Sequence, residues 1–290
     1  MTAAHPPAGL ARDGGLGRPD RRAPAAGSPG PADRAPVVVL ATAYSGATRL
    51  RPLLDRVPGL ACTSGTGILP LCEQALATWG SADGRPGRLP SALAVSATRA
   101  LADVIITSVL AREGKRRWCE ISTAMPEAAE AFLRLYPGTR FICLHRSCAG
   151  LIRAALDASP WGMADPVLVP FTRAHPATTA AALAAYWVAH TERLLAFEQS
   201  HPQAVLHVRF EELATPGQST ARAVTAFLGN GGPEDGGADG EDDAWPATPR
   251  AGAGDQDGPE AAPPAGLIPP AVLARANDLL RRLDYPALPA

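Results

Sequence analysis

Hydrophobic residues alternate along the chain between short runs typical of strands and longer runs with helical spacing. Residues 37–40 are apolar and mostly β-branched, as in a strand that is buried on both faces. Similar short runs predict strands over residues 117–121, 141–145 and 205–210. Helices are predicted over residues 68–79, 91–112, 126–136, 151–158, 177–199, 219–228 and 267–283. Strands that alternate with helices predict an α/β fold with a mostly parallel sheet.

The first predicted strand leads into a turn of small and polar residues, 41–47, followed by a helix. Backbone N–H groups of such a turn, and the positive end of the helix after it, form a site for a phosphate-like anion. Ser45 and Thr48 would add hydroxyl donors, and Gly46 would let an anion approach the backbone. A strand-to-helix corner without a ligand has the same pattern, so both interpretations stay open at this point.

Lys115 is the only lysine in the chain, and it lies far downstream of this turn. The nucleoside-triphosphatase version of the turn requires Gly-Lys-Ser/Thr where the helix begins. An ATPase or kinase of that type is therefore excluded.

Arg146 follows the predicted strand at 141–145 directly. In an open α/β sheet, ligands gather outside the carboxyl ends of the strands. A guanidinium there would bind a phosphate through two parallel hydrogen bonds. The alternative is a surface arginine that caps the sheet edge or pairs with a carboxylate. We favour the phosphate role, and we expect Arg146 to reach the same crevice as the turn at Ser45.

Charge is unevenly distributed along the chain. Residues 1–35 are rich in Ala, Pro, Gly and Arg and carry a net charge of +2, whereas residues 230–266 hold nine acidic residues and one arginine. Neither stretch has an apolar period, so we predict a disordered tail and a disordered acidic insertion. They flank a folded domain at 36–229, and a C-terminal helix within 267–290 is expected to dock on its core. The acidic insertion is either a solvated spacer or a contact for a basic partner protein.

The whole chain carries a net charge of −1, so the segments outside these two stretches carry +5. This charge suits a small polyanion and is too weak and scattered to indicate nucleic acid. The five cysteines have no paired spacing, which favours reduced thiols and no metal site. No run of about 18 apolar residues predicts a membrane span, and no signal pattern opens the chain. We therefore expect a cytoplasmic protein.

The order of these units resembles the bacterial branch of the sulfotransferase family that uses 3′-phosphoadenosine 5′-phosphosulfate (PAPS). The likeness covers about residues 36–229 and 267–288, and it is carried by Tyr44-Ser45-Gly46-Ala47-Thr48, residues 141–146, the segment 209–213 and Phe227-Leu228-Gly229. It implies a three-layer αβα, P-loop-like fold. It also implies transfer of a sulfuryl group from PAPS to a hydroxyl or amine of a small-molecule acceptor.

The resemblance assigns roles to particular positions of this chain. The family's loop holds the 5′-phosphosulfate, and here it reads Tyr44, Ser45, Gly46, Ala47 and Thr48, with Arg49 following. The family's strand-end arginine, which holds the 3′-phosphate, is Arg146. The serine eight residues later, which shares that role, is Ala154 here.

Several family positions have lost their functional side chain. The basic residue of the loop is Tyr44, its first threonine is Ala47, and the lysine after the second sheet strand is Ile121. The two positions at which the family carries a catalytic base are Gly65 and Thr123. Substitutes among the cations are Arg49, Arg51 and Arg153, and candidates for the base are Glu120, Glu73 and His175.

These losses leave three hypotheses. The first is an active PAPS-dependent sulfotransferase. The second is a degenerate member of the family that keeps the fold and serves as a nucleotide-binding or partner-binding subunit. The third is a P-loop-like enzyme that uses another anionic donor. Removal of one preorganised donor costs about 3–4 kcal/mol of transition-state stabilisation, so the combined losses bear directly on activity.

Overall fold

A computed structural model describes residues 35–79, 91–158, 166–214, 219–228 and 266–289. Five strands form one sheet in the order β2-β3-β1-β4-β5, and every described pairing is parallel. The strands are β1 (Val37–Ala41), β2 (Leu60–Ser64), β3 (Arg117–Ser122), β4 (Arg140–His145) and β5 (Val205–Arg209). The predicted acidic insertion and residues 1–34 of the predicted tail lie outside the described residues.

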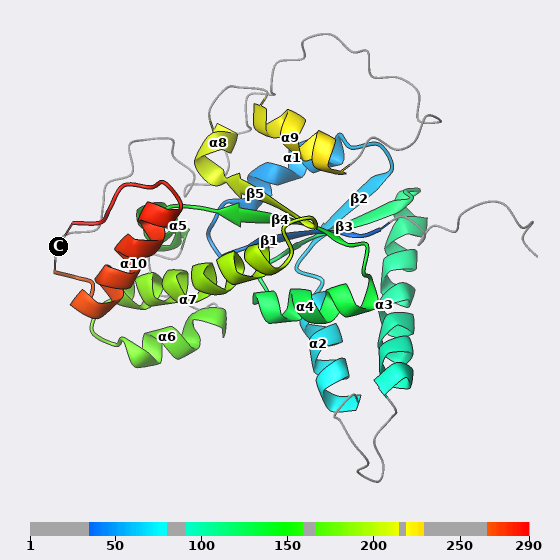
Figure 1. The fold of residues 1–290 in the computed structure, drawn as a ribbon, viewed down its shortest axis with the longest axis horizontal. Coiled ribbons are helices and arrows are strands. Elements are labelled where there is room, and N and C mark those ends of the chain that lie inside the picture. Colours follow the sequence, from blue (N-terminus) through cyan, green and yellow to red (C-terminus); the bar gives the residue numbers. More distant parts are fainter. Residues whose placement is uncertain (1–34, 80–90, 159–165, 215–218, 229–265, 290) are drawn as a thin grey trace, which may run out of the picture. The chain divides into compact units, whose positions relative to one another are not determined.

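Helices connect the strands and form two layers, one on each face of the sheet (Figure 1). On one face lie η1 (Ala47–Leu50), α1 (Arg51–Asp55), α8 (Phe210–Ala214) and α9 (Ser219–Leu228). On the other lie α2 (Ile68–Trp79), α3 (Ser91–Glu113), α4 (Pro126–Leu135) and α7 (Thr179–Ser200). The remaining helices are α5 (Cys148–Ala158), η2 (Pro166–Leu168), α6 (Val169–Ala174) and α10 (Pro270–Arg282). The three-layer α/β fold with a parallel sheet is confirmed.

The position of β1 between two helical layers explains why its apolar residues do not alternate with polar ones. Val37 and Val39 pack with α1 and α9 on one face, whereas Val38 and Leu40 pack with α2 and α4 on the other. All five residues of β1 are buried, because helices cover both faces of a parallel sheet.

The edge strand β2 was not predicted from the sequence. Its residues, Leu60–Ser64, read Leu-Ala-Cys-Thr-Ser, with only one large apolar side chain. It pairs with β3 alone, and its last two residues are partly or fully exposed. A short edge strand needs little apolar surface, so its sequence gives a weak strand signal.

Helix α3 qualifies a second expectation, that no segment could span a membrane. By length and a mean hydropathy of 1.6 it is apolar enough to cross one, and 28% of its most apolar window is buried. A search for an unbroken apolar run misses this helix because Arg99 and Asp103 interrupt its apolar residues. The inner side of α3 packs against α2, α4 and β3, and one such helix is weak evidence of a membrane span.

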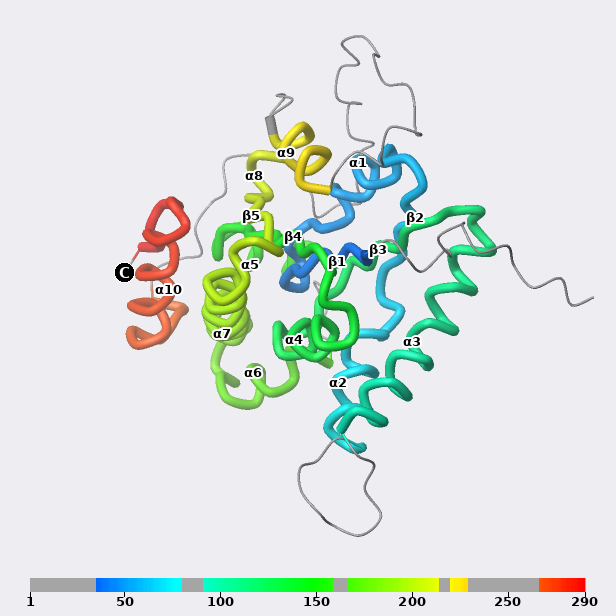
Figure 2. The backbone as a smooth tube through the Cα atoms, turned by 45° about the vertical axis from the view of Figure 1, so that its right-hand side comes forward, coloured from blue at the N-terminus to red at the C-terminus, as the bar shows by residue number. Residues whose placement is uncertain are grey.

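The C-terminal helix α10 packs along α7 (Figure 2). Ala276, Leu279 and Leu280 of α10 join a buried cluster with Leu183 and Trp187 of α7. After α10 the chain turns at Asp284, whose φ of 59° is left-handed, and Tyr285 becomes buried.

Candidate functional site

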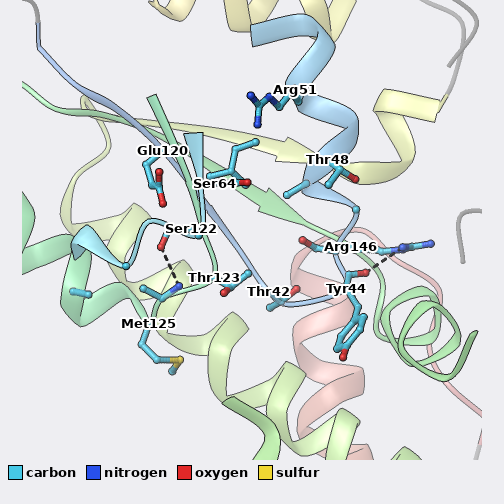
Figure 3. Close-up of a pocket in the computed structure, with 18 of the residues that line it drawn as sticks. Thr42, Tyr44, Thr48, Arg51, Ser64, Glu120, Ser122, Thr123, Met125 and Arg146 are labelled. Carbon is cyan, nitrogen blue, oxygen red and sulfur yellow. Dashed lines mark hydrogen bonds between the residues drawn. The ribbon is translucent and has the colours of Figure 1, made fainter. Parts of the chain in front are cut away.

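The carboxyl ends of β3, β1 and β4 are neighbours in the sheet, and the segments that follow them line one cavity (Figure 3). The cavity has a volume of about 1100 Å³. One end is lined by Arg146 and by the segment that follows β1, from Thr42 to Thr48. The other end is lined by Ser64, Glu120 and Met125, together with the start of α2.

The need for glycine at position 46 has a structural cause that the sequence did not reveal. Its φ of 76° is left-handed, and a Cβ at this position would overlap the ring of Phe210. We expected glycine here so that an anion could approach. The structure instead shows that the space beside the Gly46 Cα is filled by Phe210. A glycine is needed because of that ring and the left-handed backbone.

Ser45 and Thr48 both line the cavity. Ser45 is 1% exposed, and among the described residues its Oγ has no hydrogen-bond partner. A buried hydroxyl is normally paired, so this one marks a place where a ligand oxygen would be accommodated. Tyr44 and Ala47 also line the cavity, and Tyr44 adopts a left-handed φ of 64°.

Arg146 lies at the same end of the cavity as this loop, as expected. One of its guanidinium nitrogens, Nη1, donates a hydrogen bond of 3.2 Å to the carbonyl of Tyr44. The guanidinium also lies 4.1 Å from the ring centroid of Phe210, and the residue is 5% exposed. Two segments a hundred residues apart in the sequence therefore meet at one site.

The substitute cations are separated by the structure. Arg51 lines the cavity, and Figure 3 shows it extending from α1 on the side where Ser64 and Glu120 lie. Arg49 is not among the lining residues: it is buried, with its guanidinium 5.2 Å from the centroid of Phe210. Arg153 lies on α5, 3.8 Å from Asp157, and is also not among the lining residues. Arg49 and Arg51 lie on different sides of a short helical turn, so of the three substitute cations only Arg51 lines the cavity.

Two positions with lost side chains also line the cavity. Ala154 on α5 is 6% exposed, and Ile121 at the end of β3 is 7% exposed. Ile121 packs in the apolar cluster with Leu50 and Leu54. A lysine at position 121 would lay its apolar stem along this cluster and extend its ammonium toward the cavity.

The three candidate bases have different surroundings. His175 ends α6 and is not among the lining residues. Glu120 lines the cavity, yet its Oε2 accepts from Thr63 Oγ1 at 2.6 Å and its Oε1 from Thr66 at 2.8 Å and 2.9 Å. The Glu120 carboxylate therefore holds the β2–α2 loop in place.

Glu73 is the candidate base that faces the cavity from the second turn of α2. Burial, and secondly the carboxylate of Glu127, raise the pKa of Glu73. A raised pKa makes a carboxylate a stronger base, which suits it to take a proton from an acceptor. Glu73 is thus the best placed of the three.

Comparison with known sequences assigns this chain to a family. A model of the sulfotransferase family matches residues 36–231 of this chain. The chain belongs to the sulfotransferase family. The match ends shortly after α9, so α10 and the turn that follows it lie beyond the matched residues.

One of the similar solved structures supports the fold. The sulfotransferase domain from the curacin biosynthetic pathway has a TM-score of 0.53 at 14% identity, over 88% of this chain and 99% of that domain. A sulfotransferase from Alicyclobacillus acidocaldarius has a TM-score of 0.46 at 16% identity, over 86% and 95% of the two chains. A mouse sulfotransferase complexed with PAP has a TM-score of 0.38 at 16% identity, over 68% and 59%. At these identities the first likeness shows the fold alone. No curated protein is similar enough to count as a relative.

In this member of the sulfotransferase family, the loop after β1 is supported from α7. The hydroxyl of Tyr186 accepts a hydrogen bond of 2.9 Å from the N–H of Ala43. His190, one turn further along α7, is fully buried and lies edge-on to Tyr186, with ring centroids 5.8 Å apart. Burial lowers the pKa of His190 to about 4. Sequence spacing gave no sign of either support, because they lie more than 140 residues from the loop.

A separate cluster of titratable groups lies on the α7 side of β4 and β5. Glu198 bridges two histidines, with 2.6 Å to His145 Nε2 and 3.1 Å to His207 Nδ1. Burial raises the pKa of Glu198, but the bonds from the two histidines together outweigh it and lower that pKa to about 2.

These three side chains have the composition of a metal site, and their ligand atoms lie within 4.8 Å of one another. The rings of His145 and His207, however, are stacked 4.3 Å apart at an angle of 18°. An imidazole nitrogen binds a metal through a lone pair in the ring plane, and two stacked planes share no such point. The cluster is therefore a hydrogen-bonded clamp that ties the end of β4 to α7.

Proposed function

We propose that this sulfotransferase binds PAPS across the carboxyl ends of β1 and β4 and transfers its sulfuryl group to a hydroxyl or amine of a small-molecule acceptor. The observation that carries the proposal is the 3.2 Å contact between Arg146 and the carbonyl of Tyr44. It brings a buried guanidinium and an anion-binding type of loop to the same end of one cavity. PAPS carries an anionic group at each of the two corresponding positions, 3′ and 5′.

The residues present fit the donor in most respects. The loop N–H groups and the hydroxyls of Ser45 and Thr48 would bind the 5′-phosphosulfate, and Arg146 would bind the 3′-phosphate. Arg51 supplies the cation that Tyr44 and Ile121 do not. The lost hydroxyls at Ala47 and Ala154 weaken both subsites without closing either.

The acceptor would enter at the far end of the cavity, where Pro70, Met125 and Ala128 provide an apolar lining. Glu73 would take the proton from the acceptor hydroxyl as its oxygen attacks sulfur. The bond from sulfur to the 5′-phosphate oxygen breaks, and 3′-phosphoadenosine 5′-phosphate (PAP) leaves with the electron pair. The developing charge on that phosphate would be stabilised by the loop and by Arg51.

A calorimetric titration with PAP tests the donor site. We expect Arg146→Ala to weaken PAP binding roughly 100-fold, because it removes a charged, two-point contact. Arg275→Ala is the matched control, since Arg275 pairs with Glu192 on α10 and α7 and does not line the cavity. Equal affinities of Arg146→Ala and the native chain would reject the assignment.

The second candidate is a degenerate sulfotransferase that binds nucleotide and serves as a partner-binding subunit. The observation that favours it is the loss of the cations and hydroxyls at Tyr44, Ala47, Ile121 and Ala154. Incubation with PAPS and a panel of alcohols, phenols and amines separates the two functions. Release of PAP that depends on an acceptor supports the enzyme, whereas tight PAP binding with no turnover supports the subunit.

A further inference from the structure

The turn after α10 docks at the carboxyl ends of β4 and β5. Tyr285 is 7% exposed, and its hydroxyl donates a hydrogen bond of 2.6 Å to Oε2 of Glu211. The same hydroxyl lies 3.4 Å from the carbonyl of His145, at the limit of a hydrogen bond. Arg209, at the end of β5, donates to the carbonyl of Asp284 and lies 4.3 Å from the Tyr285 ring centroid.

Tyr285 is the donor in this arrangement. Burial, and then the adjacent carboxylate of Glu211, raise the pKa of its phenol, so the proton stays on the oxygen. The 2.6 Å distance is that of a charge-assisted O–H to carboxylate bond. Tyr285 therefore restrains Glu211 more tightly than an ordinary neutral contact would.

Glu211 transmits this restraint to the residue after Arg146. Its other oxygen, Oε1, accepts a hydrogen bond of 3.1 Å from the backbone N–H of Ser147. Ser147 in turn accepts from the N–H of Gly150 at 3.0 Å, in the first turn of α5. The chain that carries Arg146 is thus held from Tyr285 through one carboxylate.

The carbonyl and the guanidinium of Arg146 are contacted by residues that lie within the family match, 36–231. Trp187 on α7 donates from its indole nitrogen to the carbonyl of Arg146 at 2.9 Å. Tyr44 and Phe210 contact the guanidinium itself. Among these described contacts, Tyr285 is the one that comes from outside residues 36–231.

We propose that Tyr285 is a positioning residue for Arg146, so that docking of the C-terminal turn sets the affinity of the site for a 3′-phosphate. Loss of the Tyr285 hydroxyl frees Glu211 to rotate, and the backbone at Ser147 loses a restraint. The guanidinium then samples orientations that do not match a phosphate. This inference rests on the proposed function, because it assumes that Arg146 binds the 3′-phosphate of the donor.

The test removes one hydroxyl and keeps the ring. Tyr285→Phe retains the packing with Arg209, so the turn can still dock. Tyr136→Phe is the matched control, because Tyr136 also donates a 2.6 Å bond to a carboxylate, that of Asp103, away from the cavity. Both full-length variants and the native chain are titrated with PAP and with adenosine 5′-phosphate, which lacks the 3′-phosphate.

We expect Tyr285→Phe to bind PAP roughly tenfold more weakly while its affinity for adenosine 5′-phosphate is unchanged. Tyr136→Phe should leave both affinities as they are. A second variant, Glu211→Gln, should weaken PAP binding selectively as well, and it serves if Tyr285→Phe does not fold.

Each other outcome overturns the proposal. Unchanged PAP binding, or equal losses for both nucleotides, would show that Tyr285 has only a structural role. That result leaves the proposed function intact if Arg146→Ala still loses PAP. A native chain that does not prefer PAP over adenosine 5′-phosphate would instead reject the role of Arg146, and the role of Tyr285 with it.

Discussion

The arginine end and the loop end of the proposed donor site differ in how side chains from distant segments hold their backbone. At the arginine end, the carbonyl of Arg146 accepts from Trp187 and the N–H of Ser147 donates to Glu211, which in turn accepts from Tyr285. At the loop end, Tyr186 accepts from Ala43, but the buried hydroxyl of Ser45 has no partner among the described residues. The backbone of the arginine end is thus restrained by side chains from α7, α8 and the C-terminal turn, whereas the loop end has a buried hydroxyl available to a ligand.

The same two ends differ in their departures from the family. The arginine end keeps its charged residue and loses one hydroxyl, at Ala154. The loop end loses a cation at Tyr44 and a hydroxyl at Ala47, and the lysine from β3 is Ile121. Nucleotide binding should therefore be better preserved than sulfuryl transfer, because the proposed function places the reacting sulfur at the loop end.

The largest effect is expected from Gly46→Ala, which breaks the loop end. The left-handed backbone and the overlap with Phe210 should together cost about 4 kcal/mol of unfolding free energy. PAP binding should be lost as well. Gly114→Ala is the control, since Gly114 has a φ of 63° and a Cβ added there would meet no atom within 4 Å. Denaturant unfolding in which both variants lose equal stability would contradict the role of Phe210.

Glu73→Gln should cost a similar amount of free energy, but in the barrier to turnover and not in stability. Removal of a general base should lower kcat by about 1000-fold, while the affinity for PAP stays the same. Glu127→Gln sharpens the assignment, because the carboxylate of Glu127 helps to raise the pKa of Glu73. In that variant the acidic limb of the pH–rate profile should move to lower pH. If Glu73→Gln retains full turnover, another group is the base.

His190, which packs against Tyr186 near the loop end, should make the unfolding free energy depend on pH. His190 has a pKa of about 4 in the folded chain, against 6.5 when unfolded, so the unfolded state takes up the proton first as pH falls. The unfolding free energy should therefore drop by about 3 kcal/mol between pH 6.5 and pH 4 on account of this group.

His190→Leu should remove that part of the acid sensitivity, and His175→Leu serves as the control for losing a histidine. Urea unfolding at pH 7 and pH 4 measures the difference. An equal drop in the native chain and in His190→Leu would show that the buried imidazole is not responsible.

The smallest effect is expected from Tyr44→Arg, which would make the loop end more like the arginine end. A cation at this family position should tighten PAP binding about tenfold, or about 1.4 kcal/mol, and the gain should shrink as salt is added. Tyr44→Gln separates the charge from the loss of the ring. If the arginine and glutamine variants bind equally, the alignment of this position with the family's basic residue is wrong.

The pattern of apolar residues by itself determined most of the fold. Buried parallel strands such as β1 need apolar residues on both faces, so four of the five strands and most of the helices could be located from local sequence. The position of Arg146 beside the Ser45 loop also followed, because carboxyl ends of neighbouring parallel strands meet at one edge. The edge strand β2 did not follow, since it is short and Leu60 is its only large apolar side chain.

Tertiary structure alone decided which side chains serve the site. Arg49 and Arg51 are two residues apart, and only the turn of the helix places Arg51 on the cavity and Arg49 against Phe210. Glu120 and Glu73 are equal as carboxylates, and only their neighbours distinguish the loop anchor Glu120 from the proposed base Glu73. Tyr285 supports Arg146 from 139 residues away through Glu211. Contacts between distant segments leave no period or spacing in a sequence, because they depend on how whole helices pack.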